Sequence, residues 1–445
     1  MSDALLFSLA KILGSVLLLT AVLYAVTRLG RRFRLQPEIA RKLIHISLGL
    51  YCLTFPWVFE HTWEVASVCA LAIGVFLLVR GRLRGALGEG LHGVQRVSYG
   101  EILFAVSVLL LFHLKDGHDA LWRTGLQTEP EPILYLLPIL VLTLCDAACA
   151  VVGANYGRTR FQVESGIKSW EGVAVFVVTA WLLSLIALLL FSDIPRGQAI
   201  VLAFITAGFG ALLEAASWRG LDNLFIPLGL YFMLANLMPR GLPVLLGASA
   251  IFLGVMLLLL MFAPRIKADR HVAASGATLF FCIAMFSGPQ SLLGPLASVV
   301  AYLFVARERA RVEAHDALGL ILTILSVALA YFALSDLFRA DTIFAFNVSF
   351  AALAAALLAR FAHAPRLGVL LIACLGAWLV ACVRIVGAEG LREDTVAFAG
   401  LALALVVLAC AVGRLALRCS PAQPWAKLGV VSLIVGLIAL PWSPA

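Results

Sequence analysis

The chain has 445 residues, of which 62% are hydrophobic and only 13% are charged, and its mean hydropathy is +1.02. This composition excludes a soluble domain and indicates a polytopic membrane protein. Apolar runs of about twenty residues recur from end to end, which predicts an all-α fold. A transmembrane barrel is excluded, because its strands would appear as short segments of alternating hydrophobicity.

We expect roughly 16 transmembrane helices along the chain. The first apolar run, residues 5–26, lacks a positively charged start and a clear small-residue cleavage site, which favours a retained helix over a signal peptide. The expected spans begin near Leu5, Leu43, Val65, Glu101, Ile133, Gly172, Ala199, Asn223, Leu242, Ala274, Leu292, Ala317, Thr342, Leu367, Val396 and Leu428.

The positive charges are distributed unevenly between the loops. Of the 33 Lys and Arg residues, 25 fall in the odd-numbered loops and seven in the even-numbered ones. The positive-inside rule then places the odd loops in the cytoplasm and both termini outside, as in a protein of the bacterial cytoplasmic (inner) membrane. The net charge of +8 follows from this bias and from contact with anionic lipid, so it does not indicate nucleic-acid binding.

One acidic residue interrupts the apolar stretch "LTLCDAACAVVGANYGRTRF", residues 142–161. Asp146 lies about 10 Å from the cytoplasmic end of its expected helix, so it should face protein, water or a cation rather than lipid. Helical spacing places it on one face with Ala150, Gly153 and Gly157, where something approaches the backbone closely. A neighbouring helix is one alternative, because Gly-x-x-x-Gly is also a helix-packing pattern.

A basic loop and the segment "GIKSWEG", residues 166–172, follow this helix. Lys168 precedes Ser169, which we expect to be the N-cap of the next helix. A lysine beside exposed helix amides, after a loop with Arg158 and Arg160, suits phosphate oxygens. The alternative is an ordinary capped helix with a lysine that extends to the membrane interface.

A third cluster lies in "EAASWRGLDNLFIPL", residues 214–228. Glu214, Asp222 and Asn223 offer hard oxygen ligands near the same membrane face as Asp146, a donor set typical of a site for Mg²⁺ and phosphate. The nine cysteines are scattered along the sequence, and Cys145 and Cys149 are the only close pair. We interpret them as packing residues rather than a metal site, because no His stands at metal-ligand spacing from them.

Together these stretches resemble the polyprenol kinase family, the CTP-dependent kinases of dolichol and phytol, which is distantly similar to the CTP:phosphatidate cytidylyltransferases. The elements are D-x-x-A-x-x-x-G-x-x-x-G with Cys in place of the usual Ala, K-S-x-E-G, and E-(x)7-D-N-x-x-I-P, with a weaker R-K-x-x-H match; they cover about residues 38–240. The matching residues are Asp146, Cys149, Gly153, Gly157, Lys168, Ser169, Glu171, Gly172, Glu214, Asp222, Asn223, Ile226, Pro227, Arg41, Lys42 and His45.

The resemblance implies phosphoryl transfer from CTP to the hydroxyl of a long isoprenoid alcohol at the cytoplasmic membrane face, with Mg²⁺. The implied catalytic residues are Asp146, Lys168, Glu171 and Asp222. The implied metal ligands are Asp146, Glu214, Asp222 and Asn223. The implied nucleotide and phosphate contacts are Gly153, Gly157, Arg158, Lys168, Ser169, Arg41, Lys42 and His45.

Several alternatives stay open. Arg41, Lys42 and His45 could instead be interfacial anchors with a satisfied histidine, and Glu101 could be a further metal ligand or base. A cytidylyltransferase that makes a CDP-lipid shares the glycines and K-x-W-E-G, but its His-Gly-Gly and Asp-Arg-x-Asp signature does not match the third element. A transporter would use Asp146 as an ion site, against which Lys168 argues.

Residues 1–262 are expected to form the catalytic domain, and 263–445 an additional helical domain of unassigned role with no recognised motif. The boundary is expected within residues 263–276, where charged and small residues interrupt the hydropathy. A homo-oligomer stays open.

Overall fold

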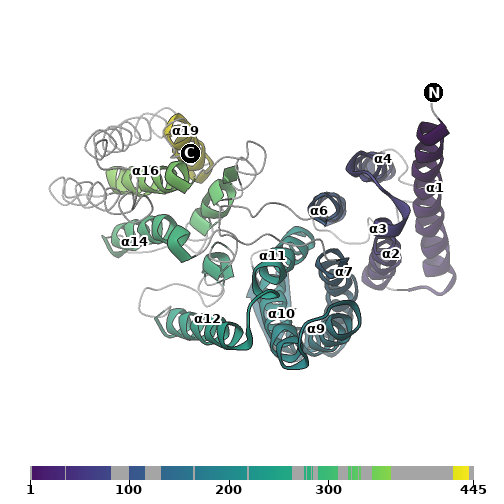
Figure 1. Cartoon of the computed structure of the whole chain (residues 1–445), viewed down its shortest axis with the longest axis horizontal. Helices are drawn as coiled ribbons and strands as arrows, with labels where there is room; N and C mark the ends of the chain where they lie inside the picture. The colour runs from purple at the N-terminus through teal and green to yellow at the C-terminus, as the bar shows by residue number, and fades with distance from the viewer. Residues whose placement is uncertain are drawn as a thin grey trace. The chain divides into compact units, whose positions relative to one another are not determined.

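The structure is a computed structural model that describes residues 3–35, 37–81, 100–115, 132–163, 166–217, 220–262, 289–308, 343–361 and 424–439, with shorter pieces between 275 and 331. The chain forms two compact units, one made of Met1–His118 with Gln127–Ile251 and the other mainly of Phe252–Ala445. Figure 1 shows helices in both units, which confirms the all-α prediction apart from one short β-hairpin.

The first unit contains every element that carries a predicted site residue. In chain order its elements are α1 (Asp3–Arg32), α2 (Pro37–Cys52), α3 (Phe55–Val58), α4 (Thr62–Gly81), α6 (Gly100–Leu114), α7 (Pro132–Leu140), η1 (Val141–Cys145), α8 (Asp146–Tyr156), β1 (Arg160–Val163), β2 (Gly166–Ser169), α9 (Trp170–Phe191), α10 (Arg196–Ala216), α11 (Asp222–Leu237) and the first part of α12 (Leu242–Phe262).

The described elements of the second unit are the rest of α12, η2 (Pro289–Leu292), α14 (Leu293–Glu308), α16 (Ile343–Phe361) and α19 (Pro424–Ala439). Within it, α16 packs against both α14 and α19. The two spans expected near Leu367 and Val396 lie outside the described residues.

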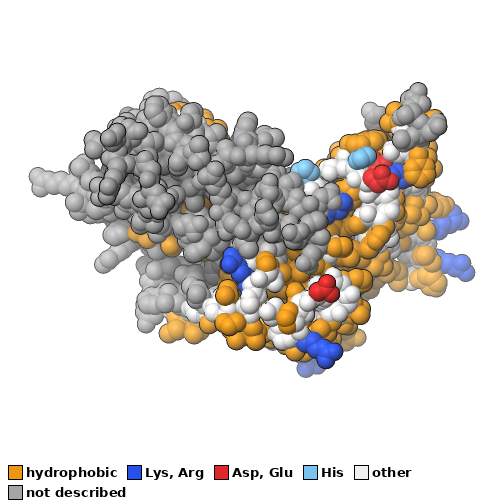
Figure 2. All heavy atoms as spheres, in the orientation of Figure 1, with side chains coloured by type: hydrophobic (Ala, Val, Ile, Leu, Met, Phe, Trp, Pro, Cys, Tyr) orange, Lys and Arg blue, Asp and Glu red, His pale blue; other side chains and the backbone are white. Residues whose placement is uncertain are grey.

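Four described segments are long and apolar enough to cross a membrane: Leu5–Arg32, Pro132–Tyr156, Trp170–Phe191 and Arg196–Ala215. Large apolar side chains cover much of the described surface in Figure 2, as expected of helices that face lipid. The protein is therefore a membrane protein with several apolar spans. The described residues do not confirm the expected count of roughly 16 helices.

A π-helical turn, η1, joins α7 to α8 directly before Asp146. Pro138 inside α7 cannot donate a backbone hydrogen bond, and the wider turn begins three residues after it. A π-helical turn shifts the side-chain register, and such turns occur frequently at functional sites. The helical spacing of Asp146, Ala150 and Gly153 lies within α8, after this turn, and is not altered by it.

The β-hairpin of β1 and β2 occupies the segment expected to be a basic loop. The strands are antiparallel, and Phe161 pairs with Lys168 in their register. The hairpin ends at Ser169, whose hydroxyl accepts a hydrogen bond of 3.1 Å from the amide of Gly172, so the expected N-cap of α9 is confirmed. The hairpin therefore places Lys168 two residues before the first residue of α9.

Candidate active site

The centre of the site is a buried ion pair between α2 and α8. The Lys42 ammonium lies 2.8 Å from Oδ1 and 2.7 Å from Oδ2 of Asp146, and the two residues are only 4% and 3% exposed. The helices approach closely because Gly49 on α2 faces Thr143, whose side chain would overlap a Cβ at that glycine. We expected the Asp146 carboxylate to face protein, water or a cation rather than lipid. In the structure it faces the ammonium group of Lys42.

His45 lies one helical turn after Lys42 and completes this side of the site. Its Nε2 is 3.6 Å from Oδ2 of Asp146 and 3.4 Å from the carbonyl oxygen of Leu142. The edge of its ring also packs against Phe104 of α6, with 5.1 Å between the ring centroids. The imidazole therefore lies between the acid and an apolar side chain.

A second, partly buried pair joins the hairpin to α10. The Lys168 ammonium lies 2.9 Å from Oε1 of Glu214 and also donates to the backbone carbonyl of Glu214. Burial lowers the pKa of Lys168, but the carboxylates of Glu214 and Asp222 outweigh that effect and hold its pKa above the ordinary value of 10.5. Lys168 is therefore charged at neutral pH.

The two pairs meet in one cluster. The ligand atoms of Asp146, Cys149 and Glu214 all lie within 4.8 Å of one another, and all three residues are buried. Asp222, at the start of α11, is close enough to act electrostatically on Lys42, Lys168 and Asp146. Elements α2, α8, β2, α10 and α11 thus place two cations and three acids around one point.

Several oxygens in this cluster are available to a ligand. Within the described part of the chain, Oε2 of Glu214, Oδ1 of Asp222 and Oδ1 of Asn223 are buried and have no hydrogen-bond partner. Buried polar atoms are rarely left unsatisfied unless a ligand or ion completes them. Gly220 helps to position Asp222 and Asn223. Its φ of 86° lies in a region that residues with a side chain rarely adopt, and it lets the chain turn directly into Asp222.

These donors fit a magnesium ion. Carboxylate and amide oxygens are the ligands Mg²⁺ prefers, whereas the thiol of Cys149 is a soft ligand that suits other metals. Glu214, Asp222 and Asn223 could each supply an oxygen that no other described group uses. A cation that took an oxygen of Asp146 would have to compete with Lys42 for it.

Gly153 in α8 and Gly157 at its C-terminal end both lie against Ser169. A Cβ at Gly153 would lie 2.9 Å from the hydroxyl of Ser169, and one at Gly157 would lie 2.7 Å from the Ser169 Cβ. Gly172 in α9 is equally close, since its Cβ would lie 2.9 Å from the carbonyl oxygen of Cys149. In this structure the glycines allow the start of α9 to pack closely against α8. This arrangement corresponds to the helix-packing alternative.

The structure does not bring every predicted residue into the cluster. Arg158 is exposed, and Glu171 uses its Oε1 to accept a hydrogen bond of 2.9 Å from the amide of Thr159. Arg41 is half-buried and acts electrostatically on Asp146 and Asp222. The predicted residues that share the cluster are Lys42, His45, Asp146, Lys168, Glu214, Asp222 and Asn223.

Besides the two lysine–carboxylate pairs, two further contacts of the site were not predicted from the sequence. Cys149 was assigned to packing, yet its sulfur lies among the carboxylates and donates to the carbonyl oxygen of Asp146 at 3.2 Å. Its place at the usual alanine of the D-x-x-A element was the only signal. Nothing in the pattern indicated that Phe104 would contact His45.

The known proteins that are similar to this chain include two with phytol kinase in their names. No family model matches the chain, and no solved structure matches it. It is 33% identical over 224 residues to the "Phytol kinase" of Synechocystis sp., a match that spans 49% of this chain and 85% of that protein. It is 22% identical over 244 residues to the "Probable phytol kinase, chloroplastic" of Triticum aestivum, spanning 48% of this chain and 74% of that protein. The resemblance found in the motifs is thereby confirmed, and the chain belongs to the polyprenol kinase family, which includes the phytol kinases.

Proposed function

We propose that this protein is a lipid alcohol kinase that transfers the γ-phosphoryl group of a nucleoside triphosphate, CTP by family resemblance, to the hydroxyl of a long isoprenoid alcohol. The observation that carries the proposal is the buried cluster in which Lys42 and Lys168 meet Asp146, Glu214 and Asp222. Such a set of fixed charges suits a reaction whose catalysis consists mostly of positioning and charge stabilisation.

In this reaction the alcohol oxygen forms a bond to the γ-phosphorus while the bond from that phosphorus to the β,γ-bridging oxygen breaks. The hydroxyl proton leaves, and the products are an isoprenoid monophosphate and a nucleoside diphosphate. Lys42 and Lys168 would hold phosphate oxygens, with Arg41 adding positive charge nearby. Asp146, Asp222 or His45 would accept the proton.

The carboxylate side of the cluster would bind Mg²⁺ through Glu214, Asp222 and Asn223, together with Asp146. When bound, this ion would neutralise phosphate charge and orient the γ-phosphoryl group. The lysine partners explain how the acids are stabilised without a ligand, because each ammonium is already paired with a buried carboxylate. Binding of the nucleotide would exchange these partners for phosphate and metal.

We place the active site on the cytoplasmic side of the bacterial inner membrane, on the basis of the charge bias between loops. Residues 1–262 would form the catalytic domain, since all of the cluster lies before α12. Residues 263–445 would form an additional helical domain.

The test is a product analysis with purified full-length protein, Mg²⁺ and a C20 isoprenoid alcohol. Label from γ-³²P-CTP should enter a lipid monophosphate, and label at the α position should stay in CDP. Asp146→Asn and Lys168→Ala should each lower turnover at least about 100-fold, as removal of fixed transition-state charges does. Arg196→Met, an exposed cation at the other end of α10, is the control and should keep full turnover.

Two outcomes would overturn the proposal. Release of pyrophosphate, with α-label in a CDP-lipid, would indicate a cytidylyltransferase instead. No nucleotide consumption with any lipid alcohol or lipid phosphate would exclude both enzymes.

A further inference from the structure

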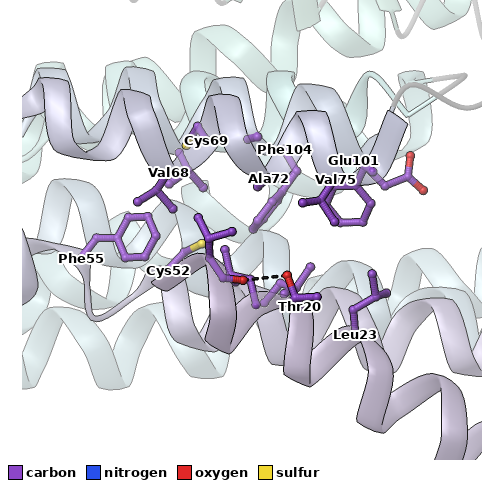
Figure 3. A pocket seen from close by; sticks show the side chains of 16 residues that line it. Thr20, Leu23, Cys52, Phe55, Val68, Cys69, Ala72, Val75, Glu101 and Phe104 are labelled. Carbon is purple, nitrogen blue, oxygen red and sulfur yellow. Dashed lines mark hydrogen bonds between the residues drawn. The ribbon is translucent and has the colours of Figure 1, made fainter. Parts of the chain in front are cut away.

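The first unit contains an apolar pocket enclosed by α1, α2, α4 and α6 (Figure 3). Its empty volume is about 620 Å³, part of which is open to the surroundings. The lining includes Leu19, Leu48, Cys52, Ala72, Phe104 and Val108.

The chemistry of the lining suits an uncharged hydrocarbon. Thr20 uses its hydroxyl to bond the carbonyl oxygen of Val16 at 2.7 Å, so it offers a ligand little polarity. Glu101 stands at one end of the pocket, and its carboxylate points away from the apolar side chains, whereas Phe55 stands at the other end (Figure 3). None of the described lining residues is a Lys or Arg.

This charge pattern separates two kinds of lipid. A carboxylate at the polar end, without a cation in the lining, disfavours the phosphate head group of a membrane phospholipid. An uncharged hydroxyl is not repelled by this carboxylate. The pocket therefore fits an alcohol with a long apolar chain better than a phospholipid.

The pocket adjoins the candidate active site through shared side chains. Phe104 lines the pocket and also packs against His45, whose Nε2 is 3.6 Å from Asp146. On the other wall, Leu48 and Cys52 follow His45 along α2. A chain in the pocket would thus have its polar end one side chain away from the buried carboxylate.

We propose that this pocket holds the isoprenoid segment next to the hydroxyl of the acceptor alcohol, with the hydroxyl directed past Phe104 toward His45 and Asp146. This inference rests on the proposed kinase function. On α4 the lining runs from Val68 to Phe76, about 12 Å at 1.5 Å per residue, so only part of a long chain fits and the remainder extends into the bilayer.

A photoreactive diazirine analogue of a C20 isoprenoid alcohol tests binding without any need for turnover. On the wild-type full-length protein, mass spectrometry should find the label on peptides of α1, α2, α4 and α6. An excess of the C20 alcohol should remove the label, and phosphatidylglycerol should not. Label confined to other helices, or equal competition by phosphatidylglycerol, would overturn the assignment.

A kinetic test uses neighbouring residues of α4. Ala72→Phe would fill the pocket, whereas Leu71→Phe, at a side chain that is 50% exposed, adds the same ring outside it. Ala72→Phe should raise the KM for a C20 alcohol about tenfold, leave the KM for CTP unchanged and affect a C5 alcohol less. Identical behaviour of the two variants with the C20 alcohol would refute the pocket. A wild-type protein that phosphorylates no alcohol would instead refute the proposed function, and the labelling result would still decide the pocket.

Discussion

The ammonium of Lys42 holds both carboxylate oxygens of Asp146, at 2.8 and 2.7 Å, although the two residues are 104 positions apart in the chain. The pair is almost fully buried, so neither charge could remain there alone. It makes α2 and α8 depend on each other electrostatically, and in the proposed reaction a phosphate and a cation would replace the two partners.

Removal of one partner should therefore destabilise the protein more than removal of both. Lys42→Met leaves the buried Asp146 without its lysine partner, which we expect to cost about 3–5 kcal/mol of unfolding free energy. The double variant Lys42→Met/Asp146→Leu should recover most of that loss and remain inactive. Thermal unfolding in detergent, with CTP turnover measured in parallel, checks both statements. Equal stability of the single and double variants would mean that the charge pair is not what stabilises this contact.

The pair of Lys168 and Glu214 predicts how stability depends on pH. The pKa of Lys168 is raised in the folded protein, so its contribution is fully present below the ordinary value of 10.5 and is lost only as pH rises through the raised value. The difference in unfolding free energy between the wild type and Lys168→Met should be constant from about pH 7 to 9 and should shrink at higher pH. Unfolding measured across this range checks it, and a difference that already declines near neutral pH would contradict the raised pKa.

The glycines of α8 should not tolerate a large side chain. Gly153→Leu would push Ser169 away and displace the start of α9. Lys168 immediately precedes Ser169 and would move with it, so activity should be lost. Gly208→Leu is the control, because nothing lies within 4 Å of a Cβ at that position in α10. Activity assays and size-exclusion profiles of both variants separate the outcomes. Normal activity of Gly153→Leu would show that the close contact is dispensable.

The ends of α9 should lie on opposite sides of the membrane. Thr159, beside the site, and Asp193, after the helix, are both exposed, and α9 has 22 residues, about 33 Å at 1.5 Å per residue. A cysteine at Thr159 should react with an impermeant maleimide only from the cytoplasm, and one at Asp193 only from outside, each measured against the wild-type background. Labelling of Thr159 from outside would invert the topology. Two other informative positions, Gly117 and Arg219, lie outside the described residues.

Local features of the site could be predicted from the sequence because they depend on neighbours along the chain. Long apolar runs must bury their backbone hydrogen bonds in helices, and most described helices begin within a few residues of the expected starts. Ser169 caps α9 because a hydroxyl three residues before a free amide can reach it. The spacing of the acidic and glycine elements was likewise enough to indicate the family.

The partners of the charged residues were decided only by the tertiary structure. Lys168 was expected to face phosphate, but β2 and α10 bring it to Glu214, 46 residues away, and α2 brings Lys42 to Asp146. The π-helical turn before Asp146 changes the register between α7 and α8, so the helical period could not relate the faces of these two segments. The contact between Phe104 and His45 arises in the same way, because residues distant in sequence choose partners by shape and charge only once the helices have packed.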